Sequence, residues 1–346
     1  MLNHGGGIQQ AALTFGLPPK KWLDLSTGIN PIGWSIPHIP ADKWLRLPED
    51  EDGLLQSASA YYGSENILPV AGSQAAIQVL SRLTEKFRVA VLSPTYSEHA
   101  HSWGFIGKKH KKPFYSTPPS HQVEQVTLRE LEKKIELYDA VVVVNPNNPT
   151  GKIISKEKLF EWRKRQAVAD KAFGGERWLI VDEAFMDSTP QLSMIGETGK
   201  PGLIVLRSLG KFFGLAGARV GFVFGWPELL DSMRQLLGPW QISGPSRHVA
   251  KNCLNDTAWH VETRSQLEEK QKQLHNMLSK YNLTPIGGTT LFKWVKVSRS
   301  KELFNKFAQH GILVRRFSDP GGIRFGLPGD KDQWQRLEST LKSISK

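Results

Sequence analysis

The order of apolar and polar positions predicts helices that alternate with short buried strands from about residue 50 onward. Segments 54–62 and 73–83 carry apolar residues at helical spacing. Five short, continuous apolar runs are typical of strands that are covered on both faces: 89–92, 140–144, 178–181, 203–206 and 219–224. Because this alternation is typical of βαβ units, we expect a largely parallel sheet flanked by helices.

The two ends of the chain follow different patterns. Residues 1–45 are rich in Gly, Pro and Trp around one short predicted helix, 9–15. Beyond residue 240 the pattern predicts an α+β unit of helices and strands, at 260–280, 291–297, 303–309, 312–316 and 333–344. We therefore predict an α/β fold with a large domain (46–240), a small α+β domain (241–346), and an N-terminal arm (1–45) that joins part of the small domain.

Composition excludes several classes of protein. The single cysteine, Cys253, cannot form an intramolecular disulfide, which favours a reducing compartment. The first ten residues, MLNHGGGIQQ, lack the basic and apolar parts of a secretory signal. No apolar run approaches the roughly 18 residues that suggest a membrane span. We expect a cytoplasmic protein with no membrane association.

The chain has an excess of positive charge, with 45 Lys and Arg against 33 Asp and Glu, a net charge of +12. Such an excess attracts anions. The basic residues are spread along the chain, and the densest cluster (108–112) is short and accompanied by no nucleic-acid-binding motif. We interpret the cluster as a solvated surface loop, and we expect small phosphorylated ligands rather than nucleic acid. We expect no metal site.

Three polar motifs directly follow predicted strands, where ligands bind in open α/β sheets. They are Asn145-Pro-Asn-Asn148-Pro-Thr-Gly151, Asp182-Glu-Ala-Phe185 and Ser208-Leu-Gly-Lys211. A carboxylate at a dry strand end needs a partner, and a partly buried lysine has a lowered pKa and a nucleophilic amine. Taken singly, each motif could instead be a turn, a helix cap or a surface charge.

Two further segments could hold an anion. Gly72-Ser73 opens a predicted helix, whose N-terminus presents free N–H groups. Arg219 follows the glycine-containing run after Lys211, and its guanidinium can bind a phosphate through two hydrogen bonds. Each feature alone is common, and most Gly-Ser helix starts are only caps.

The order of these motifs, over about residues 26–326, resembles pyridoxal phosphate (PLP) enzymes of the aspartate-aminotransferase fold. The resemblance implies that Lys211 forms the Schiff base, Asp182 pairs with the pyridine nitrogen, Asn148 binds the phenolic oxygen and Tyr96 stacks on the ring. It implies that the cofactor phosphate is held by a separate set of residues: Gly72, Ser73, Gln74, Ser208 and Arg219. Two positions depart from the pattern, since relatives usually have Tyr at Phe185 and many have Tyr at Leu47. That second Tyr reaches the phosphate of the partner subunit in the homodimer that is usual for the family.

The N-terminal segments His4-Gly5-Gly6 and Leu23-Asp-Leu-Ser-Thr-Gly-Ile-Asn-Pro31 resemble the threonine-phosphate decarboxylases of cobalamin biosynthesis. These enzymes remove CO2 from L-threonine O-3-phosphate, which carries two anionic groups. Arg324 matches the family's arginine that receives a substrate anion. The full set of candidate substrate-binding residues, which could bind two anionic groups, is His4, Gly5, Thr27, Gly28, Asn148, Arg315 and Arg324. Arg315 could instead be a surface arginine at a strand end. Arg316 beside Arg315 leaves open which of the two contributes, and His4 could instead be a disordered terminal histidine.

Two other functions stay open at this stage. Histidinol-phosphate aminotransferases share the fold and a phosphorylated substrate, although the N-terminal motifs weigh against them. A non-catalytic PLP-fold subunit is the third reading, against which the intact Lys211, Asp182, Asn148 and Arg219 argue.

Overall fold

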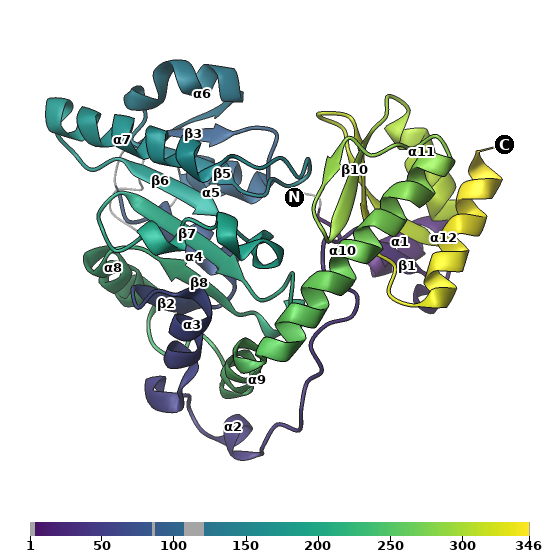
Figure 1. The fold of residues 1–346 in the computed structure, drawn as a ribbon, viewed down its shortest axis with the longest axis horizontal. Helices are drawn as coiled ribbons and strands as arrows, with labels where there is room; N and C mark the ends of the chain where they lie inside the picture. The colour runs from purple at the N-terminus through teal and green to yellow at the C-terminus, as the bar shows by residue number, and fades with distance from the viewer. Residues whose placement is uncertain (1–3, 85–86, 107–120, 346) are drawn as a thin grey trace.

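The computed structural model describes residues 4–84, 87–106 and 121–345. Figure 1 shows two lobes, a larger one around a seven-stranded sheet and a smaller one around a five-stranded sheet, with helix α10 (Thr257–Lys280) running between them. The basic cluster at 108–112 lies outside the described residues.

The sheet of the large lobe is mostly parallel, as predicted. Its strand order is β2-β8-β7-β6-β5-β3-β4, and only β8 runs antiparallel to its neighbours. The strands are β2 (Ile67–Val70), β3 (Arg88–Leu92), β4 (Gln122–Val126), β5 (Ala140–Val144), β6 (Trp178–Asp182), β7 (Leu203–Ser208) and β8 (Gly221–Phe224). Every residue of β5, β6, β7 and β8 is buried, which explains their continuous apolar sequences.

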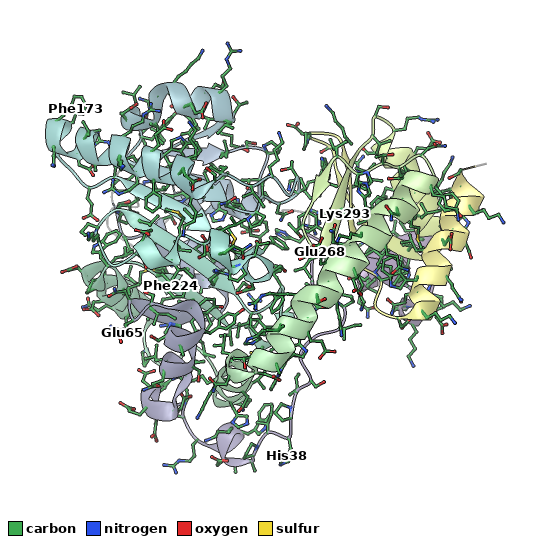
Figure 2. The ribbon with its side chains drawn as sticks, in the orientation of Figure 1. His38, Glu65, Phe173, Phe224, Glu268 and Lys293 are labelled. Carbon is green, nitrogen blue, oxygen red and sulfur yellow. The ribbon has the colours of Figure 1, made fainter. Side chains whose placement is uncertain are left out.

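Helices cover both faces of this sheet. They are α3 (Leu54–Tyr62), α4 (Ser73–Leu80), α5 (Ser97–Ile106), α6 (Leu128–Lys134), α7 (Lys156–Phe173) and α8 (Pro227–Leu237), with the short α2 (Asp42–Leu45) preceding them. Aromatic rings join helix to sheet: Tyr62 of α3 packs edge-on against Phe224, which Figure 2 labels. No helix in the described part of the chain is long and apolar enough to span a membrane.

The predicted element boundaries were mostly confirmed. The helix at 54–62 is as predicted, whereas the one at 73–83 already ends at Leu80. The strand predicted at 219–224 begins at Gly221, because Arg219 adopts a left-handed backbone conformation (φ 53°) that a strand cannot contain. The 18-residue helix α7 was not predicted, because its composition is dominated by Lys, Glu and Arg and only four of its residues are buried.

The small lobe combines both ends of the chain. Its sheet has the order β1-β11-β12-β10-β9, in which β1 (Leu23–Leu25) pairs parallel with β11 (Ile312–Phe317). The remaining elements are β9 (Gly287–Gly288), β10 (Phe292–Lys296), β12 (Gly322–Gly326), α1 (Ile8–Phe15), α11 (Ser300–Gln309) and α12 (Lys331–Ile344). Domain boundaries at 45 and 240 stay a prediction. Helix α9 (Gly244–Asn255), just after the second boundary, is ion-paired through Arg247 to Asp52.

Candidate active site

The carboxyl ends of β3, β5, β6 and β7 lie at one edge of the large sheet, where the polar motifs follow them. An inner compartment at this edge is lined by residues that are distant in sequence: Ser73, Gln74, Tyr96, Val144, Asn148, Asp182, Ala184, Phe185, Ser208, Lys211 and Arg219. All of the predicted cofactor-binding residues except Gly72 are in this set. The fold therefore brings these residues together in one compartment, and their roles toward a cofactor stay a prediction.

Asp182 ends β6 and is almost completely buried. Its Oδ2 accepts a hydrogen bond from Nε2 of His99 at 2.8 Å, and its Oδ1 accepts one from the backbone N–H of Ala184 at 3.0 Å. His99 lies in the first turn of α5 and is buried as well. Both oxygens are thus fixed in orientation, as a carboxylate that pairs with a cationic ring nitrogen requires.

Lys211 lies in the turn after β7, and the N-terminal segment holds this turn in place. The backbone N–H of Asn30 donates to the Lys211 carbonyl at 2.9 Å, and the Asn30 amide donates to the next carbonyl, that of Phe212, at 3.0 Å. Burial, followed by the positive charge of Arg324, lowers the pKa of the Lys211 amine to about 8. A lysine in this state is partly neutral near physiological pH and can act as a nucleophile.

The predicted phosphate site lies where α4 meets the segment before β8. A Cβ atom on Gly72 would lie 2.5 Å from Nη2 of Arg219, so only glycine lets this guanidinium lie across the helix start. Helix α4 has no side-chain cap among the described residues, which leaves its first N–H groups for an anion. Ser208 is buried nearby at the end of β7. This glycine-lined cradle and uncapped helix fit a phosphate group.

A larger outer cavity of about 560 Å³ adjoins the inner compartment and shares Tyr96, Asn148, Phe185 and Lys211 with it. Its volume is in the range of sites for small organic ligands. The predicted substrate-binding residues all line it: His4, Gly5, Thr27, Gly28, Asn148, Arg315 and Arg324. His4 is therefore part of the cavity wall, against the alternative of a disordered terminal residue.

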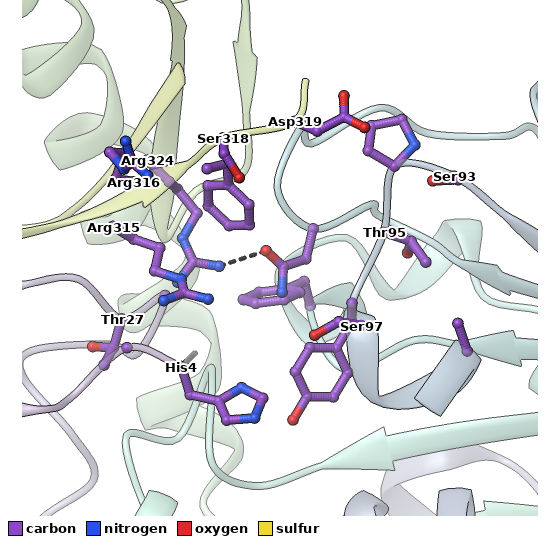
Figure 3. A pocket seen from close by; sticks show the side chains of 18 of the residues that line it. His4, Thr27, Ser93, Thr95, Ser97, Arg315, Arg316, Ser318, Asp319 and Arg324 are labelled. Atoms are coloured by element: carbon purple, nitrogen blue, oxygen red, sulfur yellow. Dashed lines mark hydrogen bonds between the residues drawn. The ribbon is translucent and has the colours of Figure 1, made fainter. Parts of the chain in front are cut away.

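Arg315 and Arg324 face each other across β11 and β12, and both side chains extend into the cavity (Figure 3). Arg324 is buried, and it donates to Oδ1 of Asn148 at 2.6 Å and to the Ser26 carbonyl at 2.7 Å. Its buried Nε has no partner within the described residues. Burial, followed by the charge of Arg315, lowers the pKa of Arg324 to about 9. Because the buried Arg324 and the half-buried Arg315 repel each other, an anion that binds between them stabilises both charges.

Arg316 also borders the cavity but extends in the opposite direction from Arg315 (Figure 3). Successive residues of a strand point to opposite faces, so only one of the two can lie beside Arg324. The structure places Arg315 there, and its part in substrate binding stays a prediction.

Sequence reasoning missed three residues that contact the predicted ones: Ser26, Glu98 and His99. Gly6 N–H donates to Oγ of Ser26 at 2.8 Å, and Nε2 of His4 lies 2.7 Å from Oε1 of Glu98. Ser26 lies within the motif at 23–31, so the sequence did contain a signal that could have identified it. Nothing in the sequence connects Glu98 or His99 to partners 94 and 83 positions away.

Phe185 and Leu47, the two positions that depart from the family pattern, lie in different environments. Phe185 lies at the junction of both compartments, with its ring packed edge-on against Phe292 and below the Lys211 amine. It contributes an apolar wall and no hydrogen bond. Leu47 is exposed and lines neither compartment.

Comparisons with known proteins agree with this geometry. The family model described as aminotransferase class I and II matches residues 51–339. The chain is 45% identical to a threonine-phosphate decarboxylase of Pseudomonas aeruginosa, over 99% of this chain and 97% of the relative. It is 38% identical to one from a Sinorhizobium species, over 98% and 97%.

A solved structure has the same fold. The histidinol-phosphate aminotransferase of Sinorhizobium meliloti, in complex with pyridoxal-5'-phosphate, superimposes with a TM-score of 0.80 over 99% of both chains at 17% identity. The family match covers most of the sequence, and two relatives exceed 30% identity over nearly all of it. The chain therefore belongs to the aminotransferase class I and II family.

Proposed function

We propose that this chain is a PLP-dependent carboxy-lyase that converts L-threonine O-3-phosphate to (R)-1-amino-2-propanol O-2-phosphate and CO2. The observation that carries the proposal is the outer cavity, in which Arg315, Arg324 and His4 offer separate receptors for two anionic groups beside Lys211. The two relatives at 45% and 38% identity, both named threonine-phosphate decarboxylase, support the same reaction.

The residues of the inner compartment fit PLP. Lys211 would hold the cofactor covalently, Asp182 would pair with its ring nitrogen, and Tyr96 would lie on its ring face. Its phosphate would lie in the cradle described above, between the start of α4, Ser208 and Arg219. When bound, PLP withdraws electrons from the α-carbon of an amino acid, and this lets the bond to the carboxylate break.

The protein's own contribution is to hold charges and to choose the bond that breaks. The hydrogen bond from His99 keeps the Asp182 carboxylate oriented, so that it stabilises positive charge on the ring nitrogen. Asn148 is held by Arg324, which couples the cofactor side of the cavity to the substrate side. The Lys211 amine, with its pKa near 8, can carry the proton that replaces the lost carboxylate at the α-carbon.

Phe185 forms an apolar wall beside Lys211, at the junction of the outer cavity and the inner compartment. Its ring packs on Phe292, and a Cβ on Gly28 would come within 2.9 Å of both rings. An apolar wall lowers the local dielectric constant and so strengthens the attraction between the buried Arg324 and an anion. Positioning of the two substrate anions then determines which bond at the α-carbon is aligned for cleavage.

One assay separates the possible functions. The purified protein is incubated with L-threonine O-3-phosphate and no keto acid, and CO2 release is measured. Release supports the decarboxylase, whereas turnover that requires 2-oxoglutarate identifies an aminotransferase, the alternative favoured by the family description. No turnover with any amino acid would identify a non-catalytic subunit. Lys211→Ala is expected to lose both the cofactor absorbance and the borohydride-stable attachment of the cofactor.

Three broader features belong to the same proposal: a role in cobalamin biosynthesis, a cytoplasmic location and a homodimeric state. Large apolar side chains are exposed along residues 36–47, including Trp44, Leu45 and Leu47. Such a concentration is typical of an interface between subunits. Light scattering in solution tests the homodimer, and a monomer at micromolar concentration would contradict it.

A further inference from the structure

Four side chains form a continuous chain of hydrogen bonds between the outer cavity and the inner compartment. Nε2 of His4 lies 2.7 Å from Oε1 of Glu98, and Nε2 of Gln74 donates to Oε2 of the same carboxylate at 2.8 Å. The hydroxyl of Tyr96 donates to Oε1 of Gln74 at 3.3 Å. Glu98 is the centre of this chain, and no motif of the sequence pointed to it.

The orientation of each member follows from the chemistry of the carboxylate. A carboxylate only accepts hydrogen bonds, so His4 donates through Nε2–H. In the imidazolium form both ring nitrogens donate, so that Nδ1–H is the donor that remains for an anion. Because the Gln74 amide donates to Glu98, its oxygen must turn toward Tyr96. Glu98 therefore fixes the orientation of the His4 ring and of the Gln74 amide.

Glu98 is also well placed to hold the N-terminal segment. It comes from α5 of the large lobe, and its side chain is only 14% exposed. The segment has a second attachment in the small lobe, where Gly6 N–H bonds Ser26 and a Cβ on Gly5 would lie 2.5 Å from the Ser26 carbonyl oxygen. The N-terminal segment is thus attached to Glu98 on the large lobe and to Ser26 on the small lobe. The His4 ring also packs against the Tyr96 ring, with 5.9 Å between the centroids, and the hydrogen bond to Glu98 sets which edge of the ring faces the large lobe.

We propose that Glu98 is a positioning residue of the substrate site, which acts by holding His4 against the cavity. The inference rests on the proposed function only for the identity of the substrate. It predicts that loss of the carboxylate weakens substrate binding through His4, while cofactor attachment at Lys211 and the rate of the bound complex change little.

The kinetic test compares Glu98→Ala, His4→Ala and the double variant. Each single variant is expected to raise KM for L-threonine O-3-phosphate about tenfold, the effect of one lost hydrogen bond to a charged group, with kcat within about twofold. Since Glu98 acts through His4, the double variant should resemble the singles rather than multiply their effects. The control is Glu338→Gln on α12, which removes a carboxylate that is ion-paired with Lys280 of α10. Neither residue lines the outer cavity or the inner compartment, so KM should stay unchanged.

A second measurement does not depend on turnover. Gly7→Cys places a thiol at an exposed position, with φ −79° and no atom within 4 Å of the new Cβ, while the native Cys253 is buried. A spin label there should become more mobile when Glu98→Ala is added, and should not change when Glu338→Gln is added. An unchanged label together with an unchanged KM, or multiplied effects in the double variant, would overturn the proposal. A wild-type protein that releases no CO2 would instead contradict the proposed function, and the label would still test Glu98.

Discussion

Replacement of Arg324 by Met gives the sharpest test of the site. Methionine keeps much of the volume of the side chain but removes the guanidinium, which is buried and bonds Asn148 and the Ser26 carbonyl. Truncation of one partner of a buried, hydrogen-bonded charge pair costs roughly 2–5 kcal/mol. We take about 3 kcal/mol, which corresponds to a fall of about 150-fold in kcat/KM.

Two companion variants show whether charge or geometry is responsible. Arg324→Lys keeps the charge and loses the planar pair of donors, so we expect a smaller fall of about tenfold. Arg299→Met removes an exposed arginine on the surface and should leave kcat/KM unchanged. The assay is CO2 release from L-threonine O-3-phosphate, with cofactor absorbance measured in parallel to show that each variant is loaded.

Arg324→Met should also change the pKa of Lys211. The charge of Arg324 is the largest cause, after burial, of the lowered pKa of this lysine. In the cofactor-free Arg324→Met protein the pKa should therefore rise above about 8. If kcat/KM falls less than threefold while the cofactor remains bound, and the lysine titrates as before, then Arg324 is not the substrate receptor that the geometry indicates.

Three further outcomes are expected. First, capture of PLP by the cofactor-free protein needs the neutral amine of Lys211, so its rate should rise with pH through about 8 and then level off, measured by absorbance; a rise that continues to the ordinary lysine pKa of about 10.4 would contradict the burial of this group. Second, Asp182→Asn should retain the cofactor but lower kcat by about 100-fold or more, because charge on the ring nitrogen loses its partner; a smaller loss in the CO2 assay would exclude this role. Third, Gly28→Ala places a Cβ within 2.9 Å of Phe185 and Phe292 and should lower the free energy of unfolding by about 1–3 kcal/mol. An unchanged denaturant midpoint would show that the rings can move aside.

The sequence by itself determined the large sheet and most of the cofactor compartment. Central strands of a covered parallel sheet are continuous apolar runs, and parallel strands end at one edge. Polar motifs placed directly after such runs, at Asn148, Asp182 and Lys211, must therefore meet in space. Local order along the chain was enough to predict that these residues meet, whereas their roles toward the cofactor are what the family resemblance implies.

Only the tertiary structure decided how the two ends of the chain come together and which of their residues line the outer cavity. Residue spacing could not show that β1 pairs with β11, that Arg315 rather than Arg316 lies beside Arg324, or that Glu98 connects His4 to Gln74. Helix α7 was not predicted because charged residues interrupt its apolar positions, of which Val168 and Phe173 are exposed, so no clear apolar face is visible in the sequence. These features depend on contacts between residues up to about 300 positions apart, such as Arg324 with Ser26, and no periodic pattern records them.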